Sequence, residues 1–174
     1  MKRFAQVVLL ALLPLCAQNS PTSQNDPWQA LNFLNGTWEA KTPRNGGPAV
    51  NGTYTFQREL KGHVLARHST KSGCSGPNDF DCQHSDLLYI FEEAPGLALK
   101  AIYFDNEGHV IHYDVSTPGP TTAIFLSEPS QHSPQFRLVY ELKDVVMSGK
   151  FQMRMPGQTE WKTYLEWSGA KIKS

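Results

Sequence analysis

The stretch Phe33-Leu34-Asn35-Gly36-Thr37-Trp38 constrains the fold of this chain more than any other. A short apolar segment runs here into Gly-x-Trp, and about ten strand-like segments follow. The glycine permits a tight backbone passage, and the indole offers a large apolar surface. This combination predicts the closed end of a small β-barrel, with Gly36 and Trp38 forming the barrel floor.

Strand-like runs separated by turn-forming residues occupy the rest of the chain. They are expected near 37–42, 52–60, 63–70, 85–93, 97–105, 109–116, 121–128, 135–142, 145–154 and 159–168. Before them, Asp26-Pro27 provides a cap and a first-turn proline for one short helical turn. Sequential hairpins need no long crossovers, and closure removes exposed sheet edges. The predicted fold class is therefore all-β: an up-and-down antiparallel barrel of about ten strands with a short N-terminal helical turn.

The turns between the strands predict which side chains share the inner face. A turn at Lys143-Asp144 would pair Tyr140 with Met147, and the loop after Met155 would pair Met153 with Trp161. These two registers place nine residues on one face: Phe136, Leu138, Tyr140, Met147, Phe151, Met153, Trp161, Leu165 and Trp167. The Asp105-Asn106-Glu107-Gly108 turn would add an inward pair by setting Ala101 opposite Tyr113, and it would set Tyr103 opposite Ile111.

The N-terminal segment has the pattern of an export signal. Lys2 and Arg3 precede an apolar run that is too short to span a bilayer comfortably, which predicts a signal peptide over residues 1–17. Cys16 allows a lipoprotein signal as the alternative, although the preceding Leu15 is large for that processing. The remaining predictions are a flexible mature N-terminus at 18–25, one barrel domain at 26–170 and no stable membrane insertion after cleavage. The expected location is periplasmic or secreted.

The two cysteines beyond the leader lie in one loop. Cys74 and Cys82 are expected to form a disulfide in an oxidising compartment. A metal site that includes His84 is the alternative, but C-x7-C-x-H matches no common zinc spacing. No metal site is predicted.

Charge is balanced, with 16 basic and 16 acidic residues, and charged residues make up only 18% of the chain. There is no basic stripe that would neutralise phosphates, which argues against nucleic acid as a partner.

The chain resembles the calycins, which include lipocalins, fatty-acid-binding proteins and nitrobindin-like haem barrels. The resemblance rests on the motif Gly36-Thr37-Trp38, which enters the first strand after a short helical segment. The strand number resembles the last two branches. With the hairpin at residues 101–109, the resemblance extends to an uncharacterised bacterial family of exported and cytosolic barrels and covers about residues 28–168. Barrels of this size are usually containers for a small molecule. Nitrobindin-like barrels bind haem through a histidine near the C-terminal strands, but the last histidine here is His132. No cofactor is expected, and haem is the alternative.

The candidate ligand-binding residues are inward by parity or register. Arg58 shares parity with Phe56, and a guanidinium in such a cavity would hold a carboxylate or phosphate. The Lys61-Gly62 turn leaves open whether Arg67 or His68 joins this face. Four aromatic residues complete the set: Tyr103, Tyr113, Tyr140 and Trp161.

No catalytic residue is predicted, because the alternating His112 and Asp114 lack an accompanying nucleophile or metal-ligand set. The expected function is a non-enzymatic exported barrel that binds a small apolar or amphipathic molecule. The alternatives are a haem barrel or barrel isomerase, and an envelope protein whose barrel is filled by side chains. An interior below about 300 Å³ would favour the filled barrel.

Overall fold

The computed structural model describes residues 26–43, 49–76 and 82–173, which form a closed antiparallel barrel. The strands are β1 (Gly36–Lys41), β2 (Ala49–Glu59), β3 (Val64–Ser75), β4 (Asp86–Glu92), β5 (Leu99–Asp105), β6 (Val110–Gly119), β7 (Thr122–Ser127), β8 (Gln135–Lys143), β9 (Val146–Arg154) and β10 (Lys162–Ala170). Each strand pairs with its neighbours in sequence, and β10 closes the barrel on β1. The predicted fold class is confirmed. The predicted leader at 1–17 and the segment 18–25 lie outside the described residues.

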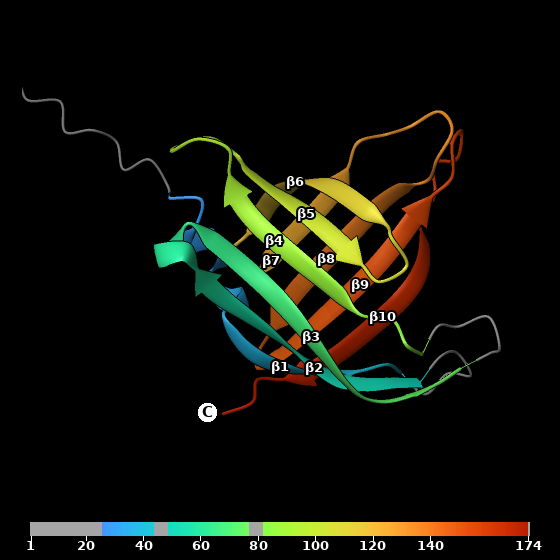
Figure 1. The fold of residues 1–174 in the computed structure, drawn as a ribbon, viewed down its shortest axis with the longest axis horizontal. Helices are drawn as coiled ribbons and strands as arrows, with labels where there is room; N and C mark the ends of the chain where they lie inside the picture. The colour runs from blue at the N-terminus through green and yellow to red at the C-terminus, as the bar shows by residue number, and fades with distance from the viewer. Residues whose placement is uncertain (1–25, 44–48, 77–81, 174) are drawn as a thin grey trace, which may run out of the picture.

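One end of the barrel is covered by η1 (Gln29–Leu34), a short 3-10 helix that precedes β1 (Figure 1). The Asp26 carboxylate accepts a hydrogen bond from the Trp28 backbone N–H at 3.0 Å, which begins the turn. The Trp38 indole N–H donates to the Leu34 carbonyl at 2.8 Å, and the Trp38 side chain is buried. Gly36 between them has a φ of +108°, a conformation that favours glycine. This geometry ties η1 to the first strand and makes this end the closed one.

Apolar side chains fill the half of the barrel next to η1. Alternation along each strand produces this filling, since Leu88 and Ile90 of β4 are fully buried while Leu87, which precedes them, is exposed. The largest fully buried side chains are Leu31, Leu34, Phe56, Leu65, Leu88, Ile90, Phe125, Tyr140 and Met147. The packed core therefore lies at the closed end, and the open end has a different interior.

The predicted β5–β6 register is confirmed, because Tyr103 lies opposite Ile111 and Ala101 opposite Tyr113. The predicted β8–β9 register is wrong by two residues, since Tyr140 lies opposite Gly149. The turn there is formed by the two residues between Lys143 and Val146. A shift of two residues preserves the side-chain parity, so the predicted faces of these two strands are unaffected.

The predicted β9–β10 register is wrong in a way that changes one side chain's face. Met153 lies opposite Lys162, and an irregularity between Thr163 and Leu165 shifts the pairing by one residue. Trp161 consequently lies on the outer surface, where its ring contacts the guanidinium groups of Arg137 and Arg154 at 4.4 and 4.7 Å. The prediction that Trp161 faces inward is overturned.

The seam between β1 and β10 depends on a close approach at Gly169. A Cβ atom built there would lie 2.2 Å from the Glu39 carbonyl oxygen, which belongs to rigid backbone. We expect Gly169→Ala to lower the free energy of unfolding by about 1–3 kcal/mol, because the two strands must separate to admit the methyl group. Urea denaturation followed by circular dichroism measures this. Gly119→Ala is the control, since a Cβ there meets nothing within 4 Å; equal losses in the two variants would contradict the prediction.

The predicted disulfide between Cys74 and Cys82 is present, with a Cα–Cα distance of 5.6 Å. It joins the end of β3 to the segment that leads into β4. Both strand ends lie at the open end of the barrel, so the bridge fixes part of its rim.

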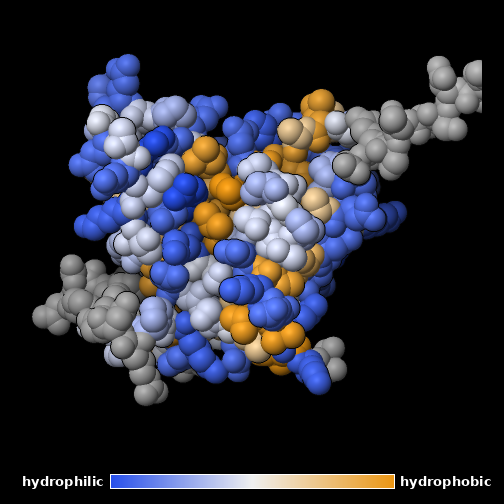
Figure 2. All heavy atoms as spheres, turned by 180° about the vertical axis from the view of Figure 1, so that it is seen from behind, coloured by the Kyte–Doolittle hydropathy of each residue, from blue (hydrophilic) through white to orange (hydrophobic). Residues whose placement is uncertain are grey.

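The outer surface is mostly polar in the view of Figure 2, with narrow apolar bands between the polar side chains. In the part of the chain that the structure describes, no helix has the length and apolar character needed to cross a membrane.

Candidate functional site

The open half of the barrel contains a cavity of about 830 Å³. One wall is polar and comes from the neighbouring strands β3, β4 and β5, with Arg67, Ser69, Asp86 and Tyr103. The apolar wall comes from β8, β9 and β10, with Phe136, Leu138, Phe151, Met153, Leu165 and Trp167. In the barrel order, β4 lies across from β9, so the two walls face each other (Figure 1). The interior is thus divided into a polar and an apolar side.

A buried ion pair forms the polar centre of the cavity. Arg67 Nη2 lies 2.5 Å from Asp86 Oδ1, and Arg67 Nη1 donates a hydrogen bond to the Tyr140 hydroxyl at 2.8 Å. The Arg67–Asp86 contact is close but falls outside good hydrogen-bond angles, so it is an ion pair without a hydrogen bond. The Arg67 side chain is only 5% exposed and that of Asp86 15%.

The pair remains charged despite its burial. Burial alone raises the pKa of the Asp86 carboxyl, but the positive charge of Arg67 and the His84 ring, 3.6 Å away, hold it below its ordinary value. Burial alone lowers the pKa of Arg67, but Asp86 and Tyr140 together keep it above the ordinary value. The cavity floor therefore carries one cation and one anion that neutralise each other.

Tyrosine hydroxyl groups surround this ion pair. Burial raises the pKa of Tyr54, Tyr113 and Tyr140, so all three are protonated at neutral pH, and the Arg67 charge acts on each of them. Their rings pack with Trp167 and Phe125 in a cluster centred on Tyr140, with centroid distances of 5.7 to 6.2 Å to its ring from Tyr54, Trp167 and Phe125. The aromatic cluster forms the boundary between the filled half and the cavity.

Besides the two atoms of the ion pair, four polar atoms of this floor are buried without a hydrogen-bond partner: Tyr54 Oη, Tyr113 Oη, Arg67 Nε and Trp167 Nε1. The Trp167 indole lies close enough to the Tyr54 hydroxyl to lower its pKa against the larger effect of burial, but the two atoms do not reach hydrogen-bond geometry. Buried polar groups in folded proteins are nearly always paired, so these four atoms are exceptions to the rule.

Titratable side chains gather at the mouth of the cavity. His84 Nε2 is hydrogen-bonded to the Tyr103 hydroxyl at 2.9 Å, and its Nδ1 lies 3.6 Å from Glu107. Asp105 accepts hydrogen bonds from the backbone of its own turn and contacts His109 Nδ1 at 2.9 Å. The Asp86 carboxylate, 3.6 Å from Nε2, is the main cause that raises the pKa of His84, with burial acting against it.

The same mouth contains donor atoms of a kind that binds metals. Ligand atoms of His84, Asp105 and Glu107 lie within 4.8 Å of one another. Each of these groups already has a partner, His84 with Tyr103 and Glu107, and Asp105 with His109, so their arrangement is explained without a metal.

The lining does not fit haem. The described histidines among the lining residues are His84 and His109, and both lie at the polar mouth in contact with acidic groups. The last histidine in the sequence, His132, is exposed in the segment between β7 and β8. Neither of these two lining histidines lies on the apolar wall, where a haem ring would pack, so neither is placed to ligate its iron.

The structure separates the candidate ligand-binding residues into two groups. Tyr103, Tyr113 and Arg67 line the cavity, and Tyr140 lies directly beneath it as the partner of Arg67. Arg67 faces inward because it lies opposite Phe56, which answers the question that the turn left open.

The other candidates lie elsewhere. Arg58 lies against the Trp28 ring at 4.1 Å and donates to the Trp28 carbonyl at 3.1 Å, so it fastens η1 to the barrel. His68 is on the outer face with the Glu59 carboxylate at 2.9 Å. Trp161 is also outside the barrel, against two arginine side chains. His112 and Asp114 point outward too, and Asp114 pairs with Lys100.

Sequence reasoning missed Asp86, although a signal was available. Asp86 has the same parity as Leu88 and Ile90 in β4, which are fully buried, so alternation alone places its carboxylate inside. A buried carboxylate needs a cation, and Arg67 on the adjacent strand meets that need. His84 precedes the strand, and no periodic pattern could have placed it.

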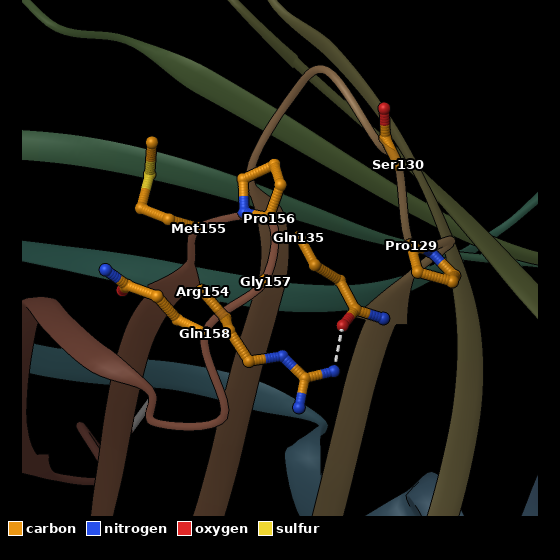
Figure 3. Close-up of a pocket in the computed structure, with 8 residues that line it drawn as sticks. All are labelled: Pro129, Ser130, Gln135, Arg154, Met155, Pro156, Gly157 and Gln158. Atoms are coloured by element: carbon orange, nitrogen blue, oxygen red, sulfur yellow. Dashed lines mark hydrogen bonds between the residues drawn. The ribbon is translucent and has the colours of Figure 1, made fainter.

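A second, smaller hollow lies at the rim, between the β7–β8 and β9–β10 connections (Figure 3). Arg154 Nη2 donates to Gln135 Oε1 there at 2.5 Å, and proline, glycine and methionine residues complete the hollow. With a volume of about 130 Å³, it holds little more than a few water molecules.

These features define the chain as a closed ten-stranded antiparallel barrel, consistent with a calycin-like fold, with a hollow open half. No family model matches the chain, and no curated protein matches its sequence.

Proposed function

We propose that this protein is an exported, non-enzymatic carrier or receptor that binds a small amphipathic molecule inside its barrel. The cavity of about 830 Å³ supports this proposal. Its volume lies within the range of about 300–1,000 Å³ typical of small-molecule sites. A barrel filled by its own side chains would leave no such space, so the cavity favours a container over a filled envelope protein.

The two unlike walls support an amphipathic ligand. Its apolar part would pack against the aromatic and aliphatic side chains of β8, β9 and β10, where burial of apolar surface stabilises the complex. Its polar part would face Arg67, Tyr103 and Tyr113 on the opposite wall. Arg67 thus takes the anchoring role that the sequence assigned jointly to Arg58 and to Arg67 or His68.

Two further features bear on the rest of the proposal. The Cys74–Cys82 disulfide is compatible with an oxidising compartment and so with export. At the mouth, His84 contacts the Tyr103 hydroxyl and His109 contacts Asp105. Burial raises the pKa of Tyr103, so this hydroxyl is not an activated nucleophile. A binding role therefore has more support than the barrel isomerase or the haem barrel.

A fluorescence titration with the neutral probe N-phenyl-1-naphthylamine tests the proposal. We expect saturable binding by the wild-type protein, with one probe per barrel. Ile111→Trp adds a large ring at the cavity wall and is expected to weaken binding at least tenfold, whereas His112→Trp on the outer face of the same strand is expected to leave it unchanged. Lack of saturable binding by the wild type, or equal binding by both variants, would count against a ligand in the barrel.

A further inference from the structure

The four unpartnered polar atoms and the ion pair lie together at the floor of the cavity. We infer that the end of the ligand that reaches this floor is uncharged and carries a hydrogen-bond acceptor, such as a carbonyl oxygen. This inference rests on the proposed binding function and specifies the chemical class of ligand.

The charges of the lining argue against an anionic end. Arg67 is already neutralised by Asp86 at 2.5 Å, so it has no net charge to offer a carboxylate. Among the described lining residues, Asp86, Asp105 and Glu107 outnumber Arg67, the one arginine or lysine. A carboxylate on the floor would lose its hydration and face a second carboxylate without a new cation.

The hydrogen-bonding groups argue against a cationic end. Arg67 Nε and Trp167 Nε1 can only donate, and both lack an acceptor. The Tyr54 and Tyr113 hydroxyl groups, each on a side chain 2% exposed, also have a proton free to donate. An ammonium group brings only further donors to this place and leaves all of these unsatisfied. A carbonyl oxygen has two lone pairs and no charge, and it meets both conditions.

The side chains that carry these atoms line the cavity, but the atoms themselves are almost closed off from its open space, so a ligand reaches them only when the side chains shift. The Tyr54 and Tyr113 hydroxyl groups differ from that of Tyr140, which accepts a hydrogen bond from Arg67 at 2.8 Å and so contributes to the fold. A group kept buried without a partner destabilises the ligand-free protein, and a ligand that supplies the partner recovers that loss. Tyr54 and Tyr113 should therefore matter to the ligand more than to the fold.

Three ligands with similar alkyl chains and different heads test the charge argument: 2-undecanone, decanoate and decylammonium. Each is titrated against the protein loaded with N-phenyl-1-naphthylamine at pH 7.5. We expect the ketone to displace the probe with a dissociation constant at least tenfold below those of the two charged compounds. Equal or tighter binding of decanoate or decylammonium would overturn the inference and leave the binding function standing.

Two conservative variants test the role of the hydroxyl groups. Tyr54→Phe and Tyr113→Phe should each weaken 2-undecanone about tenfold, leave the affinity for undecane unchanged, and leave the thermal midpoint of the ligand-free protein equal or higher. Tyr140→Phe is the matched control, since it removes a partnered hydroxyl and should lower the midpoint. Wild-type affinity for the ketone in both Tyr54→Phe and Tyr113→Phe would refute the inference, as would equal losses for ketone and alkane. Failure of the wild type to bind any compound, the probe included, would instead reject the proposed function.

Discussion

Asp86→Asn is expected to lower the free energy of unfolding by about 3–5 kcal/mol, because it leaves the Arg67 guanidinium charged and buried without an anion. The substitution keeps the side-chain shape, so the loss reports the charge and not a cavity. Urea denaturation at pH 7 measures it. The isosteric change Asp114→Asn is the control: it removes the carboxylate from an exposed pair with Lys100 on the outer surface and is expected to leave the urea midpoint almost unchanged.

The same carboxylate gives the stability a definite dependence on pH. Because the pKa of Asp86 is lower in the folded than in the unfolded protein, its contribution is fully present above its unfolded pKa and is lost as the pH falls. The free energy of unfolding of the wild type should therefore fall between about pH 5 and pH 3, and that of Asp86→Asn should fall less steeply. His84, whose pKa is raised on folding, is protonated in both states over this range and adds no slope. Parallel pH profiles of wild type and variant, or equal urea midpoints at pH 7, would show that the ion pair does not stabilise the fold.

Trp38→Ala is expected to cost a similar amount, about 3–5 kcal/mol, because it empties a large volume in the packed end of the barrel. The Trp38 ring is 2% exposed, and its indole N–H is the donor to the Leu34 carbonyl. Removing it deprives the fully buried Leu31 and Leu34 of η1 of the surface on which they pack. The loss is measured as the shift of the urea midpoint, with far-ultraviolet circular dichroism as the signal.

Trp161→Ala is the matched control for Trp38→Ala. This tryptophan lies outside the barrel between two guanidinium groups, so its removal takes away surface contacts and leaves no void in the core. A loss in Trp161→Ala as large as that in Trp38→Ala would contradict the assignment of Trp38 to the closed-end core.

The comparison of the two tryptophans also shows where sequence reasoning succeeds. Alternation of apolar residues predicted ten strands within a few residues of their observed bounds and placed Leu165 and Trp167 on the inner face. It placed Trp161 wrongly because the β9–β10 pairing contains an irregularity next to Tyr164, which no turn signal announces. The two-residue error in the β8–β9 turn had no such consequence, since parity is unchanged.

Strand parity also predicted part of the candidate site. Arg67, Tyr103 and Tyr113 are cavity residues because parity within a strand is a local property that survives folding. Arg58 has the right parity as well, but it lies at the end of β2 that η1 covers, so its guanidinium reaches Trp28 instead of the cavity. How deep a side chain lies along the barrel axis depends on the stagger between strands, and the sequence contains no direct signal for that stagger.

By itself, the sequence determined the all-β class, the order and faces of most strands and the disulfide, because these follow from local periodicity, turn chemistry and the nearness of two cysteines in one loop. Only the tertiary structure decided that the closed half is filled and the open half hollow, and that Asp86 neutralises Arg67. Those properties depend on which side chains from distant strands lie at the same height along the barrel axis. That height is set only when all ten strands close into the barrel.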